Sequence, residues 1–522
     1  MLVSDVPSLA AHNAPADRSI HFEDHATTYK KFAYRCEQLS RALTALAPRG
    51  ARIAVLSGNR PEFMECYFGV PGAGMIMLPL NFRLGLRDLG HILRDAEPAV
   101  IMVEPAYLPL IDELRGDLPA DVSLIVLGTA PAGALDYETL LDRGHARDMP
   151  QRPAEDEPAW LLYTSGTTGR AKGALLTHRN IMAAVLSMLC GSDLGRIEVS
   201  LFLFPMFHIA GYVLPGYLLR GYSIVLMRGF DVENYLTNVE KYGITQHAIA
   251  PTMLAMVLDD PRTDRFDTSS LRNISYGASA MAPEILRAAM TRWPNVGFRT
   301  AYGMTELAGN VTYLTREDHE HALAHDQSVL ASCGMPNPLS NVRIVDAEGR
   351  DVVPGQPGEI TVRGEQVFAG YWRNERATQE SFRDGWFLTG DIGRCDPDGR
   401  FYIVDRKKDM IISGGENVYS REVEDLLYEH PSVAEVAVVG APDDKWGETV
   451  VALVRLRSDV TSGALDEFCK ARIGRYKRPR RYVFVEELPK SATGKILKAE
   501  LRQLLRSGHF DPRNPDEHAH CQ

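Results

Sequence analysis

The segment Tyr163–His178, YTSGTTGRAKGALLTH, is the most informative stretch of this 522-residue chain. Its glycine and hydroxyl residues can bring backbone N–H groups and side-chain donors close to an anion, and Lys172 adds a positive charge at the same place. The residues before it, from Trp160, read as a buried strand, and Asn180–Leu189 reads as a helix. A loop between two core elements is not a typical flexible linker. The segment therefore predicts a phosphate-binding loop.

This loop differs from the nucleotide-binding loop G-x-x-x-x-G-K-[ST]. Gly166 and Gly169 are too close together for that pattern, and Lys172 is followed by Gly173. The sequence therefore does not favour a kinase-like or GTPase-like protein.

Length and composition indicate an ordinary globular protein with more than one domain. The chain exceeds the roughly 250–300 residues at which a single hydrophobic core stops growing. It is 45% hydrophobic and 24% charged, and its net charge of −11 argues against a general nucleic-acid binder. The N-terminus lacks a signal-peptide pattern, no apolar run is long enough to cross a bilayer, and the seven cysteines form no C-x-x-C pair. We expect a cytoplasmic protein with no transmembrane segment.

Hydrophobic patterning predicts an α/β fold. Short apolar runs alternate with helical patterns in the first half of the chain: RIAVLSGN (52–59), PEFMECYFGV (61–70), IMLPLN (76–81), LRDLGHILRDA (86–96), AVIMVE (99–104) and SLIVLG (123–128). This alternation is typical of layered helices and largely parallel sheet. From about Val342 the strands become shorter and turns more frequent, which indicates an antiparallel β module.

Four further motifs follow the Tyr163–His178 segment in a fixed order. They are AYGMTE (301–306), GWFLTGD (385–391), DRKKDMIISGGENVY (405–419) and PKSATGKILK (489–498). With the first loop, they resemble the adenylate-forming superfamily, which includes acyl-CoA synthetases, aryl-CoA ligases, beetle luciferases and the adenylation domains of peptide synthetases. The resemblance extends from near the start of the chain to about Leu501, and fatty-acyl-CoA ligases are the nearest group.

The resemblance implies a reaction in two steps. A carboxylate attacks the α-phosphate of ATP to give acyl-AMP and pyrophosphate, and a thiol then takes the acyl group. Because a carboxylate must approach a polyanion, the site needs Mg²⁺ and fixed cations. We expect ATP, Mg²⁺ and CoA to be used, with an apolar carboxylic acid as the substrate.

The resemblance also assigns roles to individual residues. The phosphate-binding residues are Thr164, Ser165, Gly166, Thr167, Thr168, Gly169 and Lys172. The Mg²⁺ ligands are Thr164 and Glu306, and the residues around adenine and the acyl pocket are Gly277, Ala278, Ala301, Tyr302, Gly303 and Thr305. Asp391 and Arg406 match the contacts to ribose. The chain departs from the family where Ala171 replaces a usual proline, and where Thr300 and Ala301 replace a frequent Gln-Gly pair.

The remaining assignments concern the transfer step and the C-terminal region. Lys495 matches the lysine that reaches the α-phosphate and the substrate carboxylate, and Lys408 matches a hinge between the two half-reactions. Gly414 and Gly415 match the lining of the tunnel for the thiol arm. His208 resembles a residue that positions or gates the substrate; it is not expected to act as a base, because a carboxylate is already ionised at pH 7.

We therefore expect a large N-terminal domain, residues 1–407, built from layered α/β subdomains and a β module. A small mobile α/β domain, residues 408–522, should follow it. The basic cluster Arg472–Arg481 either meets the phosphates of CoA or is solvated. A homodimer is left open.

Other functions remain alternatives at this stage. The enzyme could load a carrier protein instead of CoA, or retain mainly the thioester-forming step. A non-catalytic nucleotide-binding protein is disfavoured because Glu306, Arg406 and Lys495 are all retained.

The acid itself is predicted from the residues expected to line its pocket. These are Phe207, His208, Gly211, Gly277, Ala278 and Gly303. None could pair with an ammonium group, and burying an unpaired charge is costly, so an amino acid is disfavoured. The small residues were expected to leave room for a medium-to-long fatty acid, an aryl acid or a polycyclic acid.

The assignment of Lys495 yields a test of the two half-reactions. We predict that Lys495→Ala lowers acyl-AMP formation by several orders of magnitude but spares thioester formation from supplied acyl-AMP. The reason is that a fixed charge at the α-phosphate stabilises one transition state only. Pyrophosphate release and thioester formation are measured separately, and an equal loss in both assays would contradict the role.

Overall fold

The computed structural model describes residues 1–14, 16, 18–131, 134–164, 171–191, 198–277, 281–443, 445–490, 496–508 and 518–519. The chain divides into two compact units. One contains Met1–Val342 and Val362–Phe387, and the other contains Arg343–Thr361 and Leu388–Gln522. The β module expected after Val342 therefore falls largely in the second unit. A boundary of movement at Lys408 stays a prediction.

The first unit contains two sheets, and the first has eight strands. Its strands are β3 (Arg52–Leu56), β4 (Ile76–Pro79), β5 (Val100–Val103), β6 (Ser123–Val126), β7 (Leu135–Asp136), β8 (Pro158–Thr164), β9 (Lys172–Thr177) and β19 (Gly370–Tyr371). Their order is β19-β9-β8-β4-β3-β5-β6-β7. Strands β8, β4, β3, β5, β6 and β7 pair in parallel, whereas β9 is antiparallel to β8 and to β19.

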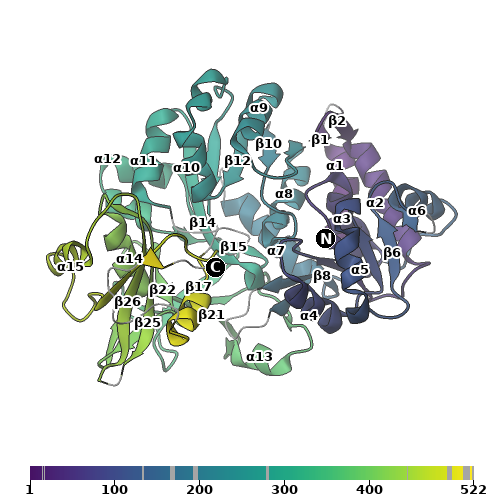
Figure 1. Cartoon of the computed structure of the whole chain (residues 1–522). Helices are drawn as coiled ribbons and strands as arrows, with labels where there is room; N and C mark the ends of the chain where they lie inside the picture. Colours follow the sequence, from purple (N-terminus) through teal and green to yellow (C-terminus); the bar gives the residue numbers. More distant parts are fainter. Residues whose placement is uncertain are drawn as a thin grey trace. The chain divides into compact units, whose positions relative to one another are not determined.

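Helices cover both faces of this sheet (Figure 1). Apolar residues of α4 (Leu86–Ala96) and α5 (Leu108–Glu113) pack with one face in a single core cluster. Helix α3 (Pro61–Gly72) contacts β3, β4 and β8, and α2 (Tyr29–Leu43) packs on α3 and α6 (Tyr137–Gly144). The side chain of Thr28 caps α2 and that of Asp136 caps α6, as expected at helix N-termini.

The second sheet has nine strands. They are β1 (Ser19–Phe22), β2 (His25–Thr28), β10 (Val199–Phe202), β11 (Ser223–Leu226), β12 (Gln246–Ile249), β13 (Asn273–Tyr276), β14 (Gly297–Met304), β15 (Gly309–Leu314) and β16 (Met335–Pro336). Their order is β16-β15-β14-β13-β12-β10-β11-β1-β2. The six strands from β14 to β1 run in parallel.

Helices again flank this sheet. Apolar residues of α9 (Val232–Tyr242), α10 (Pro251–Asp259) and α11 (Pro283–Arg292) pack on one face (Figure 1). Helix α7 (His178–Gly191) contacts both β9 and β15 and so links the two sheets, and α8 (Val213–Leu219) packs against α7 and α1 (Val6–Asn13). Helices α12 (Arg316–Ala324) and α13 (Glu375–Glu380) complete the unit. These layers confirm the α/β prediction.

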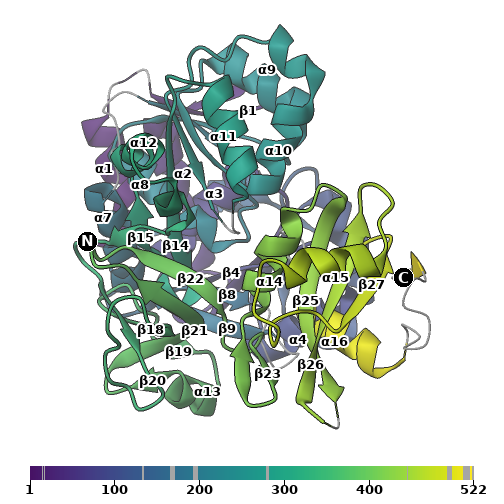
Figure 2. The ribbon, with the colours of Figure 1, turned by 90° about the vertical axis from the view of Figure 1, so that its left-hand side faces the viewer.

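The second unit holds most of the short strands and a small α/β module. The short strands are β17 (Asn341–Val345), β18 (Gly358–Arg363), β20 (Phe382–Arg383), β21 (Trp386–Cys395) and β22 (Phe401–Arg406). Strand β20 and the end residues of β17, β18 and β21 belong to the first unit, and the remaining residues of these strands belong to the second. The module has β23 (Ile411–Ser413), β24 (Glu416–Val418), β25 (Val433–Asp443), β26 (Gly447–Leu456), β27 (Arg481–Val485) and β28 (His518–Ala519). Helices α14 (Ser420–Tyr428) and α15 (Ser462–Lys470) share one apolar core with it, and α16 (Lys498–Arg506) belongs to another (Figure 2).

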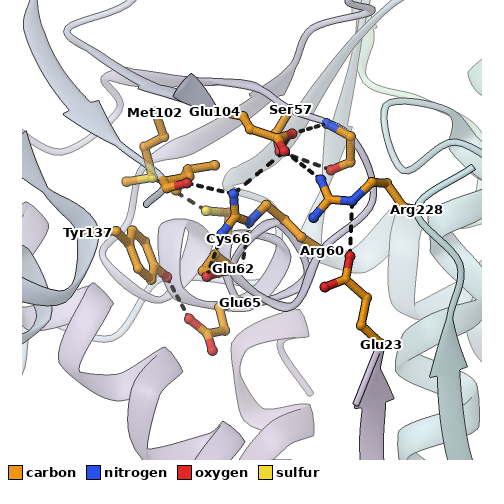
Figure 3. A network of polar contacts seen from close by, with 12 residues as sticks. Glu23, Ser57, Arg60, Glu62, Glu65, Cys66, Met102, Glu104, Tyr137 and Arg228 are labelled. Carbon is orange, nitrogen blue, oxygen red and sulfur yellow. Dashed lines mark hydrogen bonds and ion pairs between the residues drawn. The ribbon is translucent and has the colours of Figure 1, made fainter. Parts of the chain in front are cut away.

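A buried ionic cluster joins α2, α3 and α6. The carboxylate of Glu65 is buried and accepts a 2.6 Å hydrogen bond from Arg35 Nε. It also accepts a 2.8 Å bond from the Tyr137 hydroxyl (Figure 3). Burial raises the pKa of Glu65 to about 7, although Arg35 acts in the opposite direction. A charge in this position depends on its partner, because the surrounding protein cannot solvate it.

This dependence predicts a pH-sensitive loss of stability. Removing the partner with Arg35→Met should lower the free energy of unfolding by about 3–5 kcal/mol. The pKa of Glu65 should then rise further above its unfolded value, and a carboxyl group with a raised folded-state pKa loses stability as pH increases from its unfolded-state pKa to its folded-state pKa. Urea unfolding should therefore show a larger loss at pH 8.5 than at pH 6.

The matched control removes the exposed partner of the same guanidinium. Glu138 also accepts hydrogen bonds from Arg35 but is largely solvent-exposed. Glu138→Gln should therefore cost little at either pH. An Arg35→Met loss that is the same at both pH values would contradict the role of Glu65.

Candidate functional site

The two ends of the predicted phosphate loop lie side by side. Thr164 ends β8, Lys172 begins β9, and the two residues are paired in the antiparallel register. The loop residues predicted to bind phosphate between them, Ser165, Gly166, Thr167, Thr168 and Gly169, lie outside the described residues. The structure thus shows the base of the loop and places Lys172 at it, as the sequence predicts.

Glu306 is linked to Lys172, at the base of this loop, by a residue that the motifs did not identify. Its side chain is 6% exposed, and its Oε1 atom accepts a 3.0 Å hydrogen bond from the hydroxyl of Tyr371. Tyr371 lies on β19, which pairs with β9 at Ala174, and Lys172 Nζ lies 5.1 Å from the centroid of the tyrosine ring. Tyr371 therefore contacts both Lys172, which begins β9 of one sheet, and Glu306, which follows β14 of the other.

The segment around Tyr371 is fixed by backbone hydrogen bonds on both sides. The Phe368 N–H donates to the Glu306 carbonyl at 2.8 Å, and the Trp372 N–H donates to the Gly173 carbonyl at 2.7 Å. We call residues Phe368–Trp372 the strap. Nothing in the sequence singles out Tyr371, because a Gly-Tyr-Trp run reads as an ordinary packed segment.

The donor set around Glu306 suits Mg²⁺. Glu306 and Thr164 both offer hard oxygen atoms, and within the part of the chain that the structure describes no three His, Cys, Asp or Glu side chains gather into a metal cluster. Magnesium is usually bound by one or two carboxylates together with substrate phosphates and water, and not by a cage of protein ligands. Glu306 and Thr164 would hold the ion, which offsets phosphate charge when it is bound.

The residues predicted to surround adenine lie at the ends of two parallel strands. Ala301, Tyr302 and Gly303 belong to β14, Thr305 follows it, and Gly277 follows the neighbouring β13. A Cβ atom at Gly277 would have its nearest described neighbour, the Ala301 carbonyl oxygen, at 3.9 Å, which is an ordinary van der Waals contact. Ala278 lies outside the described residues. The carboxyl ends of parallel strands are where α/β folds bind ligands.

At two positions of the expected pocket floor, the side-chain face of the glycine is occupied. A Cβ atom at Gly211 would lie 2.3 Å from the hydroxyl oxygen of Tyr67, and one at Gly303 would lie 2.1 Å from the carbonyl oxygen of Gly309. Other groups pack directly against these two glycines, so their missing side chains do not themselves open space for a substrate. Among the floor glycines that the structure describes, only Gly277 would take a Cβ atom without a close contact to a described residue.

His208 follows β10 beside a group of aromatic rings. Burial and, secondarily, Arg83 lower its pKa to about 4, so the imidazole is neutral at pH 7. Phe207 meets Phe82 edge-on at 5.4 Å, and Phe82 stacks on Tyr107 at 5.1 Å between ring centroids. We call Phe82, Tyr107 and Phe207 the aromatic wall. A positioning or gating role for His208 stays a prediction.

The two predicted ribose contacts are brought together in the second unit. Asp391 on β21 and Arg406 on β22 are register partners, and Arg406 Nε lies 2.6 Å from Asp391 Oδ1. Asp391 is 2% exposed, so the alternative of a simple surface ion pair does not fit the carboxylate.

Gly414 and Gly415 form the tight turn between β23 and β24. Their φ angles of 64° and 85° belong to the left-handed region that glycine adopts without strain. A Cβ atom at Gly414 would meet the Trp446 ring at 2.7 Å, whereas Gly415 has no neighbour within 4 Å. Only Gly415 thus presents an open face. Lys408 is exposed in the turn after β22, and Lys495 lies outside the described residues.

The basic cluster is partly neutralised within the second unit. Lys477 forms an ion pair with Glu422 at 2.6 Å, and Arg478 forms one with Asp466 at 3.1 Å. Arg480 stacks on Trp446, with its guanidinium carbon 4.2 Å from the ring centroid. Arg475 is exposed to solvent.

Comparison with known proteins agrees with this arrangement. Residues 8–372 match the family model described as AMP-binding enzyme, and residues 422–495 match the AMP-binding enzyme C-terminal domain. The chain is 37% identical over 504 residues to an indoleacetate–CoA ligase from Aromatoleum aromaticum, covering 95% of this chain and 96% of that protein. It is 34% identical to the medium/long-chain-fatty-acid–CoA ligase FadD8 from Mycobacterium tuberculosis, covering 93% and 87% of the two chains.

A solved structure gives the same result. The anthranilate CoA ligase AuaEII in complex with anthranoyl-AMP superposes with a TM-score of 0.87 at 27% identity, covering 97% of this chain and 98% of that one. The chain therefore belongs to the family of AMP-binding enzymes, the adenylate-forming superfamily. In the described part of the chain, no helix has the length and apolar character needed to cross a membrane.

The contact between Tyr371 and Glu306 predicts an effect on metal binding. Tyr371→Phe removes only the hydroxyl that donates to the carboxylate, and hydrogen bonds to charged groups are worth about 1.5–3 kcal/mol. We expect the Mg²⁺ concentration for half-maximal pyrophosphate release to rise about tenfold. Calorimetry of ATP binding at graded Mg²⁺ concentrations should show the same shift without any turnover.

Tyr137→Phe is the control, because it also deletes a hydroxyl that donates to a buried carboxylate, that of Glu65. This variant should lose stability without a change in Mg²⁺ dependence. If both variants showed the same Mg²⁺ dependence, Tyr371 would have no special relation to the metal site.

Proposed function

We propose that this AMP-forming acid–CoA ligase, which uses ATP, Mg²⁺ and CoA, activates an apolar aromatic carboxylic acid through an acyl adenylate. The observation that carries the choice of acid is the aromatic wall beside His208. The names of the relatives support it, since they include indoleacetate–CoA ligase and feruloyl-CoA synthase.

The first half-reaction joins the acid to AMP. The substrate carboxylate forms a bond to the α-phosphorus of ATP, and the bond to pyrophosphate breaks. Lys172 and the loop before it bind the leaving phosphates, and Glu306 with Thr164 supplies oxygen ligands for Mg²⁺. Lys495 adds a charge at the α-phosphate, and Asp391 binds the ribose hydroxyls with Arg406 beside it. Together these groups offset the charge that opposes attack.

The second half-reaction transfers the acyl group to the thiol of CoA, with release of AMP. We propose that the domain beginning at Lys408 rotates between the half-reactions and that the open face of Gly415 lines the path of the thiol arm. A carrier protein is the alternative acceptor, since one relative is named a fatty acid–[acyl-carrier-protein] ligase.

The six described cysteines are free thiols, which suits the cytoplasmic location predicted from the sequence. Whether two copies of the chain form a homodimer is left open.

The acid is proposed from the shape and polarity of the described residues near His208. Phe82, Tyr107 and Phe207 offer aromatic surface against which a ring can stack or meet edge-on. The wall contains no carboxylate to pair with an ammonium group, so an amino acid is disfavoured. Because Gly211 and Gly303 leave no space, the case for a long acyl chain is weaker than the small residues suggested. A medium-chain fatty acid is the second candidate, supported by the named activity of FadD8.

A series of acids tests this proposal. We expect kcat/KM for CoA thioester formation to be at least about tenfold higher for arylacetic and arylacrylic acids than for acetate, because burying an aromatic side chain is worth about 1.5–3 kcal/mol. Butyrate, octanoate and dodecanoate give the chain-length arm, in which each buried methylene adds about 0.8 kcal/mol.

The outcomes separate the alternatives. A fatty acid as the best substrate would favour the second candidate over an aromatic acid. Acetate or an amino acid as the best substrate would show that the pocket walls are wrongly assigned. Turnover with an acyl carrier protein but none with CoA would show that the carrier protein, and not CoA, accepts the acyl group.

A further inference from the structure

The segment that carries His208 is held in place by the other sheet of the same unit. Residues Phe204–Ile209, which we call the His208 loop, follow β10 of the nine-stranded sheet. Asn59 follows β3 of the eight-stranded sheet and is 3% exposed. Its Nδ2 atom donates to the Phe204 carbonyl at 2.8 Å, and its Oδ1 atom accepts from the Met206 N–H at 2.7 Å. One side chain thus binds the loop at two points.

The same amide also reaches the neighbouring strand. Nδ2 donates a second hydrogen bond, at 2.9 Å, to the carbonyl of Met227, which follows β11. Asn59 therefore uses both amide protons and its oxygen on backbone groups. Only an amide can do this, because leucine offers no polar group and aspartate offers no donor. The hydrogen-bond partners also fix which end of the amide is nitrogen.

Tyr67 provides a second attachment from the same side. It lies on α3, its side chain is fully buried, and its hydroxyl donates to the Met206 carbonyl. The same hydroxyl fills the space that a side chain at Gly211 would need. The backbone of Met206, two residues before His208, is therefore bound at its N–H by Asn59 and at its carbonyl by Tyr67.

The segment that carries Asn59 is itself fixed by charged contacts (Figure 3). Glu104 Oε2 accepts hydrogen bonds from the Ser57 hydroxyl and the Gly58 N–H, both at 3.0 Å. Its other oxygen lies 2.5 Å from Arg228 Nη1, and Arg228 directly follows Met227. These contacts join the ends of β3, β5 and β11, so Asn59 projects from an anchored segment.

We propose that Asn59, assisted by Tyr67, is a positioning residue for the acid. It fixes the position of the His208 loop, and therefore of Phe207 and His208, relative to the bound acid. The proposal rests on the proposed function, in which these two residues border the acid. Asn59 itself does not touch the reacting atoms. A purely structural role would lower stability without changing the affinity for one substrate in particular.

The variant Asn59→Leu keeps the approximate size of the side chain and removes all three hydrogen bonds. We expect the KM for the acid to rise about tenfold or more, while the KM for ATP changes by less than about twofold. Hydrogen–deuterium exchange of the peptide covering residues 203–212 should be faster, because the Met206 amide loses its acceptor. The exchange measurement needs no substrate.

A matched control lies elsewhere in the same unit. Asn180 is also buried and also makes three backbone hydrogen bonds: it donates to the carbonyls of Glu365 and Val367, both at 2.8 Å, and accepts from the Thr177 N–H at 2.9 Å. Asn180→Leu should lose comparable thermal stability. It should leave the KM for the acid and the exchange of residues 203–212 within about twofold of the parent protein.

Tyr67→Phe tests the same loop if Asn59→Leu fails to fold. It keeps the ring against Gly211 and removes the hydrogen bond to Met206, so the acid KM and the exchange rate should shift in the same direction by a smaller factor, about threefold. Normal exchange and an unchanged acid KM in a folded variant would overturn the proposal.

Two mixed results are also decisive. Faster exchange with an unchanged acid KM would show that the loop is held by Asn59 but does not position the acid, which also overturns the proposal. A parent protein that releases no pyrophosphate with any acid would instead refute the proposed function, while the exchange measurement would still report whether Asn59 holds the loop.

Discussion

The arrangement of the site depends on the pairing of the strap with β9. Lys172 and Glu306 are distant in sequence, and Lys172 begins β9 of one sheet whereas Glu306 follows β14 of the other. In the proposed function, both act on the same polyphosphate. The strap pairs with β9 on one side and binds the backbone and side chain of Glu306 on the other. Because these contacts are mostly backbone hydrogen bonds, the sheet sets the separation of Lys172 from Glu306, the carboxylate proposed to bind the metal. Flexible side chains have only a small part in it.

The two sheets of the first unit also meet at a second place. The ends of β3 and β5 are joined to the ends of β10 and β11 through Glu104, Arg228 and Asn59. Parallel strands leave their carboxyl ends at one edge, where backbone groups lack partners in the sheet and loops begin. In this protein, that edge is both the connection between the sheets and the support for the His208 loop. If the acid binds at this loop as proposed, stability and substrate position depend on the same contacts.

The sequence predicted the layers, the small C-terminal module and the motif residues, because these depend on local periodicity and on residue order. It also placed Asp391 and Arg406 in one site, and the register of β21 and β22 brings them together. It did not predict which glycines have another group packed closely against them. Gly211 and Gly277 look alike in a sequence, and only the position of Tyr67 separates them. Tyr371 and Asn59 were missed for the same reason: their importance comes from backbone groups that lie far away in the chain.

The register pair Thr164–Lys172 has a consequence for how the phosphate loop can vary. The antiparallel pairing of β8 and β9 brings together the two ends of a seven-residue connection, so the closure of that connection is already fixed by the sheet. The amino-acid composition of the connection can then change without altering the distance between Thr164 and Lys172. Ala171, at a position where proline is usual, is an example. The length of the connection cannot change so freely, because an added or deleted residue would displace every donor along the loop relative to Lys172. The paired strands thus fix the distance between the two ends of the loop. Loops of equal length should therefore be interchangeable between related enzymes.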